Sequence, residues 1–498
     1  MADVITNPEG LQLTFGIEIE MLFLTNTEKI RADPAYHYIL PEHFVEGNGD
    51  DLGEDDLGMI DELWTDDDFS TISPLLQAAN ILRHEGLDLA VHVRANNINK
   101  KFDRWMLTTE SKVLHPWKNG DLAKWSEGRL QAHESSGLRF HGIELVSRIL
   151  KAPSLHPPSQ SADLSEVVRY ANVIAEASSG EKPYQFISRP ENAGVHVHVG
   201  LHPKDGEQVF IPVGVLRHLA WIVVCFEDVI SLLHHPERHG YKGTKIFNCS
   251  WSNRTSFGSR QWEGRHHSCA YLDMEAVFSR IFNKHDTPDQ DLTSLRTVMC
   301  SHYGNPAHTK GWFVSFFNIK KRSDDPKITV EFRQHHGTLD AEDLRQWVIF
   351  VTALMRTAER KANEPETNQW KEADGTSNIK LEEMAKYPSV FGSTGTRTRT
   401  LKELFDLMDM PIKTREYWWE RAKKFRNLDS TTGKDYNAMS LCEACGKLTR
   451  RDCAGWVDGE LDLKPWDEKD ETQIEAEEGA HKRAEGEIGG DQDVMELD

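Results

Sequence analysis

Four short segments of the chain alternate apolar residues with side chains that can bind cations or phosphate. They read "FGIEIE" at 15–20, "GIELVS" at 142–147, "GVHVHVG" at 194–200 and "VEFRQHH" at 330–336. Carboxylates and imidazoles bind divalent cations, and a guanidinium pairs with phosphate or a developing anion. If the four segments meet in space, they form a site for metal ions and a phosphorylated ligand.

The spacing within each segment places its functional side chains on one side. Valine and isoleucine favour β-strands, in which successive side chains point to opposite faces. Glu18 and Glu20 therefore share one face, and the isoleucines around them share the other. The same alternation joins the two histidines of 194–200, and also the Glu and the Arg of 330–336. Each strand then has an apolar face for packing and a polar face for chemistry.

Several carboxylates on one sheet face repel each other unless cations lie among them, because burying unpaired charges costs several kcal/mol each. Oxygen-rich sites of this kind suit Mg²⁺ or Mn²⁺. The sequence contains no GxxxxGK[ST] motif and no convincing GxGxxG motif. If ATP binds, we therefore expect metal ions on a sheet to hold it, without a glycine-rich loop.

Other functions use parts of the same pattern. An HxH pair on a strand also begins the metal site of amidohydrolases, so a metal-dependent hydrolase is an alternative. That alternative needs further His and Asp ligands at strand ends, and it leaves the ExE and EFR patterns unexplained. A non-catalytic binding protein that kept the fold is a second alternative. Taken singly, each motif is also typical of an ordinary solvated strand, so the interpretation depends on their combination.

The hydrophobic pattern predicts an α+β fold in which strands outnumber clear βαβ units. This favours a mainly antiparallel sheet with helices on one face. Strands are predicted within 11–24, 89–97, 103–115, 139–150, 194–200, 311–320 and 327–337, and helices over 69–86, 164–180, 212–234 and 340–363. We expect Asp163 to cap the second of these helices and Gly180 to end it. Residues 365–425 are predicted to be helical and peripheral.

The net charge of −22 comes almost entirely from two segments. Residues 46–68 hold 11 acidic and no basic residues, and 455–498 hold 16 acidic against 4 basic ones. The first is predicted to be a solvated loop and the second a disordered tail. The rest of the chain is close to neutral and lacks the basic stripe that nucleic-acid binding requires. We therefore expect no nucleic-acid partner.

Cysteine usage and the N-terminus favour a soluble protein of a reducing compartment. The seven cysteines do not resemble a disulfide framework, and the first residues lack the pattern of a signal peptide. We expect a cytoplasmic protein, with the nucleus as an open alternative and no membrane partner. Cys442, Cys445 and Cys453 could form part of a zinc site, but ordinary reduced cysteines are the favoured interpretation, because a fourth ligand is not evident.

The order of the four motifs resembles the amidoligase family, which is related to glutamine synthetases and glutamate–cysteine ligases. The resemblance extends over roughly 11–360, with gaps at the acidic loop 46–68 and the linker 151–163. It implies a curved, mainly antiparallel sheet with helices on the convex face and the site on the concave face. Together with the composition of the C-terminal part, it predicts three regions: an N-terminal extension 1–10, a catalytic domain 11–425 and a C-terminal extension 426–498.

The activity implied by this resemblance is ATP-dependent amide formation through an acyl phosphate, with an amino acid, peptide or similar small acid as substrate. By motif, Glu18 and Glu20 resemble ligands of two separate Mg²⁺ or Mn²⁺ ions. Glu144 resembles a further ligand of the first ion, and His196 and Glu331 resemble further ligands of the second.

The resemblance also suggests nucleotide and substrate contacts. His198 resembles a histidine that contacts nucleotide phosphate, and Arg333 the arginine that stabilises the transferring phosphoryl group, so that Arg333 and Glu331 are the catalytic candidates. Asn192 and Gly194 fall where the related synthetases bind the acid substrate. In "WSNRTSFGSR", Arg254 could contact phosphate and Asn253 the substrate. Related synthetases often assemble, so an oligomer is an open alternative, although no segment of the sequence identifies an interface.

Two positions depart from the family pattern. The usual W…D-G-S strand reads "WMLTTESK", in which Glu110 replaces the aspartate and the glycine is absent. Arg148 follows the serine of "GIELVSRIL" where the family commonly has proline. The first departure puts the role of this strand in doubt, and the second could alter the exit of the strand.

Overall fold

The computed structural model describes a defined part of the chain. The described residues are 10–40, 66–92, 102–113, 138–155, 161–190, 192–203, 209–231, 233–235, 253, 274–300, 311–320, 327–364 and 401–427. The chain divides into two units, 1–454 and 455–498, and the second lies wholly outside these residues. The acidic stretch up to residue 65, the tail and the three cysteines 442, 445 and 453 also lie outside them.

The centre of the fold is one large sheet in which nearly all described neighbours are antiparallel. Its order is β2-β3-β4-β1-β7-β9-β8, with β5 and β6 also paired to β1, and only β2 and β3 are parallel in this part of the chain. The strands are β1 Leu13–Asn26, β2 Ala90–His92, β3 Met106–Thr109, β4 Leu138–Val146, β5 Leu150–Lys151, β6 Tyr184–Ile187, β7 Gly194–Leu201, β8 Val314–Ser315 and β9 Val330–His336. The α+β class and the mainly antiparallel sheet are confirmed.

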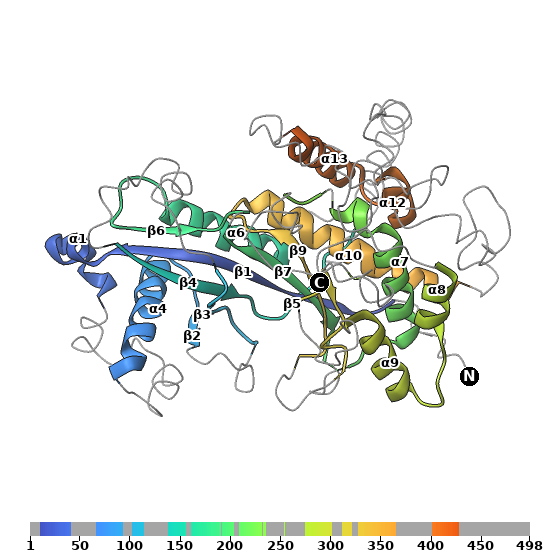
Figure 1. Ribbon diagram of the computed structural model, residues 1–498. Coiled ribbons are helices and arrows are strands. Elements are labelled where there is room, and N and C mark those ends of the chain that lie inside the picture. The colour runs from blue at the N-terminus through green and yellow to red at the C-terminus, as the bar shows by residue number, and fades with distance from the viewer. Residues whose placement is uncertain are drawn as a thin grey trace, which may run out of the picture. The chain divides into compact units, whose positions relative to one another are not determined.

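Helices α6, α7 and α10 form the main packed layer (Figure 1). The helical elements are α1 Thr27–Ala32, the 3₁₀ helix η1 Pro34–Ile39, α4 Asp66–His84, α6 Ala162–Ala177, α7 Val213–Ser231, α8 Met274–Phe282, α9 Pro288–Cys300, α10 Ala341–Asn363, α12 Leu401–Met408 and α13 Ile412–Asn427. Helix α10 contacts α6, α7, α12, α13 and strand β7, so it joins the sheet to the C-terminal helices.

The 14-residue strand β1 organises the sheet, because it pairs with four other strands. Its odd-numbered residues are buried, and Ile17, Ile19 and Met21 among them are completely so. Phe23 on the same side stacks on Phe186 of β6 at a centroid distance of 5.0 Å. Burial of this apolar face fixes the register of the strand, since a slip by one residue would exchange the two faces.

The sheet is open and uncurled, so the pronounced curvature implied by the resemblance is not seen (Figure 1). Bulges and irregularities are what bend a sheet sharply. The described strand pairs contain one register shift, between Val195 and Val197 where β7 meets β9. Here Val197 lies opposite Phe332 and Val195 opposite His335, so β9 carries one extra residue. This bulge changes which side chains at the end of β9 share a face with those at its start.

Three local predictions are corrected by the structure. Helix α4 begins at Asp66 rather than 69, so the last residues of the acidic stretch are helical, consistent with acidic side chains at a helix N-terminus. Ser161 rather than Asp163 caps α6, and its side chain accepts a hydrogen bond from Leu164 N. Strand β6 was not predicted, because its sequence is too short to show a period. The helix predicted over 340–363 is confirmed.

Among the described residues, no helix is long and apolar enough to cross a membrane.

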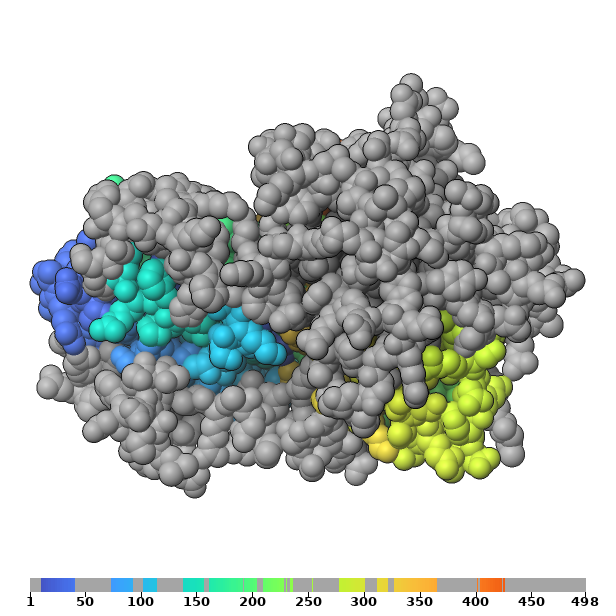
Figure 2. Space-filling view, viewed as in Figure 1, coloured from blue at the N-terminus to red at the C-terminus, as the bar shows by residue number. Residues whose placement is uncertain are grey.

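In the space-filling view, the described surface shows the α1–η1 region at one end and the α8–α9 region at the other (Figure 2).

Candidate active site

The polar residues of β4, β1, β7 and β9 lie on one face of the sheet. Glu20 pairs with Glu144 of β4, and Glu18 pairs with His196 of β7. His198 in turn pairs with Glu331 of β9. Residues directly opposite each other in an antiparallel pair have side chains on the same face. The register therefore assembles the four motifs into one row across four neighbouring strands.

The two histidines of β7 lie among the carboxylates. His196 Nδ1 is 3.5 Å from Glu18 Oε2 and 3.8 Å from Glu331 Oε1, while its Nε2 is 3.6 Å from Glu20 Oε1. His198 Nε2 is 3.1 Å from Glu18 Oε1, and its Nδ1 is 3.1 Å from Thr329 Oγ1. The hydroxyl of Thr329 thus orients the second ring toward the carboxylates.

Backbone and side-chain groups fix the carboxylates in turn. Glu20 Oε2 accepts a hydrogen bond of 2.8 Å from the backbone N–H of Gly194. Lys327 Nζ donates to Glu18 Oε1 at 2.5 Å, and Arg333 donates to Glu331. Lys327 is a site residue that the sequence analysis missed. It lies three residues before β9 but inside the strand predicted over 327–337, where period-two alternation places it on the face of Glu331 and Arg333.

The charges of the site favour the ionised forms of Glu18 and Glu331. Burial raises the pKa of Glu18, but the opposing effect of His198 and Lys327 is larger, and the pKa lies well below its usual value. Burial likewise raises the pKa of Glu331, and Arg333 and His198 lower it below the usual range. Burial lowers the pKa of Arg333, but the nearby carboxylates raise it above its ordinary value, so the guanidinium stays charged.

Glu110 joins the row at the end of β3. One oxygen of Glu110 lies within 4.8 Å of ligand atoms of Glu20 and Glu144. Burial, followed by the charge of Glu20, raises the pKa of Glu110. Gly142 permits this approach, because a Cβ there would lie 2.1 Å from the carbonyl oxygen of Glu110. The departure from the family pattern therefore leaves a carboxylate beside the site.

The arrangement fits divalent cations. Three groups of ligand atoms converge within 4.8 Å: Glu18 with His198 and Glu331, Glu18 with Glu144 and His196, and Glu20 with Glu110 and Glu144. His196 is 1% exposed, yet neither of its ring nitrogens makes a hydrogen bond. Carboxylates outnumber the two cationic side chains, and mostly oxygen donors with an occasional imidazole suit Mg²⁺ or Mn²⁺. The predicted division of roles between the two histidines stays a prediction, because both belong to such groups.

The residues predicted to bind substrate have varied surroundings. Asn192 makes local turn contacts: its Oδ1 accepts from Arg189 N at 2.9 Å, and its Nδ2 donates to Ile187 O at 3.4 Å. Asn253 is completely buried, and its Nδ2 donates to Val314 O at 2.8 Å while its Oδ1 accepts from Val314 N at 2.9 Å. These bonds hold β8 beside Glu331. Arg254 lies outside the described residues.

Arg148 has a clear structural partner. Its guanidinium donates to Glu166 Oε2 at 2.7 Å and to Asp163 Oδ1 at 2.6 Å, both on α6. The indole N–H of Trp105 also donates to Glu166, at 2.6 Å. Arg148 and Trp105 therefore fasten the exit of β4 and the start of β3 to α6.

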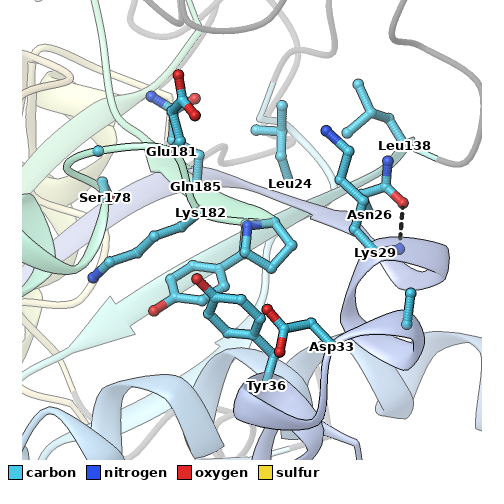
Figure 3. Close-up of a pocket in the computed structure, with 14 residues that line it drawn as sticks. Leu24, Asn26, Lys29, Asp33, Tyr36, Leu138, Ser178, Glu181, Lys182 and Gln185 are labelled. Carbon is cyan, nitrogen blue, oxygen red and sulfur yellow. Dashed lines mark hydrogen bonds between the residues drawn. The ribbon is translucent and has the colours of Figure 1, made fainter.

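A separate cavity of about 630 Å³ lies at the far end of β1 (Figure 3). Leu24, Asn26 and Gln185 line it together with Lys29 and Tyr36, and Asn26 Oδ1 accepts a hydrogen bond from Lys29 N. Leu24 shares the face of Glu18 and Glu20 by alternation, but it is four residues beyond Glu20. At a rise of about 3.3 Å per residue, the distance along the strand is about 13 Å. The cavity is therefore distinct from the carboxylate row.

Comparison with known proteins gives the class of this chain. Residues 11–355 match the family described as "Putative amidoligase enzyme", and this match covers more than half of the sequence. The chain therefore belongs to the amidoligase family, a family of ligase-type enzymes.

Comparison with curated proteins found no match. Among solved structures, the chain is similar to a bifunctional glutathione synthetase from Pasteurella multocida, with a TM-score of 0.30 and 11% sequence identity. The similarity covers 89% of this chain and 51% of that protein, so this chain spans about half of its length.

Proposed function

We propose that the protein is an ATP-dependent carboxylate–amine ligase that acts through an acyl phosphate. The observation that carries the proposal is the row of buried carboxylates and imidazoles across β4, β1, β7 and β9, with Arg333 and Lys327 beside it. Membership of the amidoligase family supports amide formation as the chemistry. We also propose that the sheet is related to the catalytic sheet of glutamine synthetases and glutamate–cysteine ligases.

Five residues are proposed to hold Mg²⁺ or Mn²⁺: Glu18, Glu20, Glu144, His196 and Glu331. Bound divalent cations neutralise phosphate charge and orient the nucleotide. The residues themselves are held before any ligand arrives, because Gly194 fixes Glu20 and the strand register fixes the others. Such preorganisation is what positioning and electrostatic catalysis require.

Arg333 is proposed to bind the oxygens of the transferring phosphoryl group. Its pairing with Glu331 holds the planar guanidinium at the edge of the carboxylate row. Lys327 is proposed as a second phosphate contact, and in the structure it pairs with Glu18. His198 is proposed as a further phosphate contact, since its Nε2 points into the row and Thr329 holds its other nitrogen.

The proposed reaction has two steps. In the first, a carboxylate oxygen of the acid substrate bonds to the γ-phosphorus of ATP, and the bond between that phosphorus and the bridging oxygen breaks to release ADP. In the second, an amine attacks the acyl carbon, the carbon–oxygen bond to phosphate breaks, and the amine loses a proton. The products are an amide, ADP and phosphate. Asn192 and Gly194 remain proposed substrate contacts, and a small amino acid or peptide is the proposed substrate class.

The direct test is ADP release by the full chain with Mg²⁺ and ATP, scanned over amino acids, polyamines and peptide mixtures. We expect substrate-dependent ADP release that disappears in Glu20→Ala and Glu331→Ala. Glu342→Ala is the matched control, because Glu342 is an exposed residue of α10 that pairs with Arg345, outside the carboxylate row. ADP release that persists at the same rate in both site variants would refute the proposed site.

The same assay separates the ligase from its alternatives. A metal-dependent hydrolase would cleave an amide without consuming ATP. A binding protein that kept the fold would bind Mg²⁺ and ATP without turnover over the whole substrate scan. The predominance of carboxylates around His196 and His198 favours the ligase, because a hydrolase of the HxH type needs more imidazole ligands in that place.

A further inference from the structure

Gln334 of β9 is a buried side chain whose amide has no partner among the described residues. It is 1% exposed, and neither its Oε1 nor its Nε2 makes a hydrogen bond in that part of the chain. A glutamine amide offers two N–H donors and an oxygen that accepts. Buried polar groups are nearly always hydrogen-bonded, so an unsatisfied amide requires an explanation of its own. The amide of Gln334 therefore points to a partner that the described protein does not supply.

The bulge between β7 and β9 turns Gln334 toward the carboxylate row. The β9 residues on either side of the bulge, Phe332 and His335, lie opposite valines of β7 on the apolar face. Arg333 and Gln334 come between them, so both lie opposite His196. Strand alternation from either side of the bulge places both on the polar face with His196. The buried amide therefore belongs to the face that carries the carboxylate row.

A second buried amide shows what a structural role looks like. Asn253 is completely buried, and its Nδ2 donates to Val314 O at 2.8 Å while its Oδ1 accepts from Val314 N at 2.9 Å. Both ends of that amide are satisfied by backbone, whereas Gln334 has no such bond within the described residues. An apolar side chain of similar size would fill the position of Gln334 without the cost of desolvating an amide. A residue that lowers stability in this way is typical of a ligand site.

Gln334 lies between two parts of the proposed active site. On one side of it along β9, Arg333 donates to Glu331, and this pair forms the proposed phosphoryl-binding end. On the other side, the strand runs to His336, which lies opposite Gly194, a proposed substrate contact. An acid substrate that reaches from Gly194 to the phosphoryl group brings its carboxyl group past the amide of Gln334.

The amide is neutral, and its neighbours serve the charged groups of the reaction. The carboxylates and His196 are proposed to hold cations, and Arg333 and Lys327 to bind phosphate. A neutral group that both donates and accepts hydrogen bonds complements a ligand that does the same. The reacting centre of amide formation fits this description, because the acyl oxygen accepts and the attacking amine donates. A donor aimed at the acyl oxygen also stabilises the negative charge that develops on it.

Given the proposed ligase function, on which this inference rests, we infer that Gln334 binds the two reacting groups of the amide-forming step. Its Nε2 donates to the acyl oxygen of the acid substrate, and its Oε1 accepts from an N–H of the attacking amine. The amide orients these groups and forms no covalent bond with either. It keeps both of its protons, and the amine releases its proton to water as the carbon–oxygen bond to phosphate breaks.

The experiment compares Gln334→Met with the wild type in the full chain. Methionine is unbranched and similar in length to glutamine, but it has no amide. Calorimetry measures the binding of Mn²⁺ and of ATP with Mg²⁺. ADP release measures kcat and KM for the acid and amine that are active in the substrate scan. Thermal unfolding without ligands measures stability, which separates a ligand contact from a structural side chain.

The three measurements should respond differently. We expect kcat to fall by about 100-fold or more, because a donor to the acyl oxygen is lost. Binding of Mn²⁺ and of ATP should stay at the wild-type level, because the amide contacts neither. The thermal midpoint should stay the same or rise, since methionine removes an unsatisfied buried amide.

Two further variants complete the design. Gln346→Met is the matched control, because Gln346 is another buried glutamine, on α10, whose Nε2 donates to Glu342 at 2.6 Å. It lies outside the carboxylate row, so ADP release should stay at the wild-type rate. Gln334→Leu serves as a second site variant if circular dichroism shows that Gln334→Met is misfolded.

Three results would overturn the inference while the ligase proposal stands. One is an active wild type with an equally active Gln334→Met variant. Another is weaker binding of Mn²⁺ or ATP in that variant, since Gln334 would then contact the metal or the nucleotide. The third is a lowered thermal midpoint or misfolding in both Gln334→Met and Gln334→Leu, which would show a structural role. A wild type without substrate-dependent ADP release would instead refute the ligase proposal, and the inference would fall with it.

Discussion

Strand β9 carries histidine or carboxylate chemistry at both of its ends, and the two ends differ in their neighbours. At its start, Glu331 faces His198 and Glu18, and charges of both signs lie close together. At its end, His335 and His336 lie among tryptophans and one buried aspartate. Imidazoles therefore lie among carboxylate oxygens at the start of β9 and among other aromatic rings at its end.

The comparison shows how neighbours decide what a histidine can bind. Near Glu18 and Glu20, ligand oxygens dominate, and hard cations with phosphate are the matching ligands. At the end of β9, the ring nitrogens of His335 and His336 lie among indole rings, and the nearest carboxylate, that of Asp343, pairs with Tyr417 and Arg421. The first of four predictions tests whether the two regions behave as separate units.

The largest expected effect comes from Trp418, which packs beside His234 and His335 at the end of β9. Trp418→Ala should lower the free energy of unfolding by about 3–5 kcal/mol, because Trp418 is completely buried against Trp347 and Phe350. Denaturant unfolding measures this loss. If the regions are separate, Mg²⁺-dependent ATP binding at low denaturant should survive. A loss of ATP binding in folded protein would mean that the two regions form one unit.

The next effect concerns the arginine between the two regions. Arg333→Lys should lower ATP turnover by about 10²–10³-fold, since lysine keeps the charge but loses the planar donor pair. Glu331 keeps a cationic partner, so the thermal midpoint should change little. The assay is substrate-dependent ADP release, with Arg345→Lys on α10 as a control. Turnover equal to that of the wild type would remove Arg333 from the phosphoryl-transfer role.

The two histidines of β7 provide a finer test within the first region. His196→Asn should weaken Mn²⁺ binding by about tenfold or more, because it removes a proposed ligand. His198→Asn should mainly weaken ATP binding at saturating Mn²⁺. Calorimetric titrations with Mn²⁺ and then with ATP separate the two effects. Identical defects would show that the predicted division of roles is wrong, even if the site is right.

The smallest effect lies outside both regions and depends on pH. Burial raises the pKa of Glu166, but hydrogen bonds from Arg148 and Trp105 lower it below its usual value. A lowered folded pKa means that the stabilisation is present at neutral pH and is lost as pH falls through the folded pKa. Arg148→Ala should therefore cost about 1 kcal/mol at pH 7, a modest value because the pair is partly exposed.

That difference between Arg148→Ala and the wild type should shrink below about pH 4, where carboxylates protonate. Thermal or urea unfolding at several pH values measures it, with the exposed residue Arg139 replaced by alanine as the control. A difference that stays constant down to the lowest pH would show that packing, not the ion pair, is responsible.

The carboxylate row was largely predictable from the sequence, because period-two alternation fixes which residues share a face. Glu18 with Glu20 and His196 with His198 lie on one face as predicted, and strand pairing adds Glu144 and Glu331. Pairing partners far apart in sequence carry no local signal. Their assembly could be predicted only from the resemblance to the amidoligase family.

Other features had no sequence signal. The bulge between β7 and β9 shifts the alternation at the end of β9, and it separates His335 and His336 from the face of Glu331. His234 meets them through packing of helices α7, α10 and α13, which local periodicity does not encode. Lys327, by contrast, had a sequence signal, because it shares the period-two face of Glu331 and Arg333 within the predicted strand 327–337. The absence of curling depends on how the strands pair and twist along the whole sheet, which no single segment of the sequence encodes.

The central claim is that the carboxylate row binds ATP together with divalent cations. Calorimetric titration of the full chain with ATP, with and without Mg²⁺, tests it most directly, with Glu18→Gln as the site variant and Glu342→Gln as the control. The account predicts saturable binding that requires Mg²⁺, is retained in Glu342→Gln and is lost in Glu18→Gln. Absence of Mg²⁺-dependent ATP binding in the folded wild-type protein would contradict it.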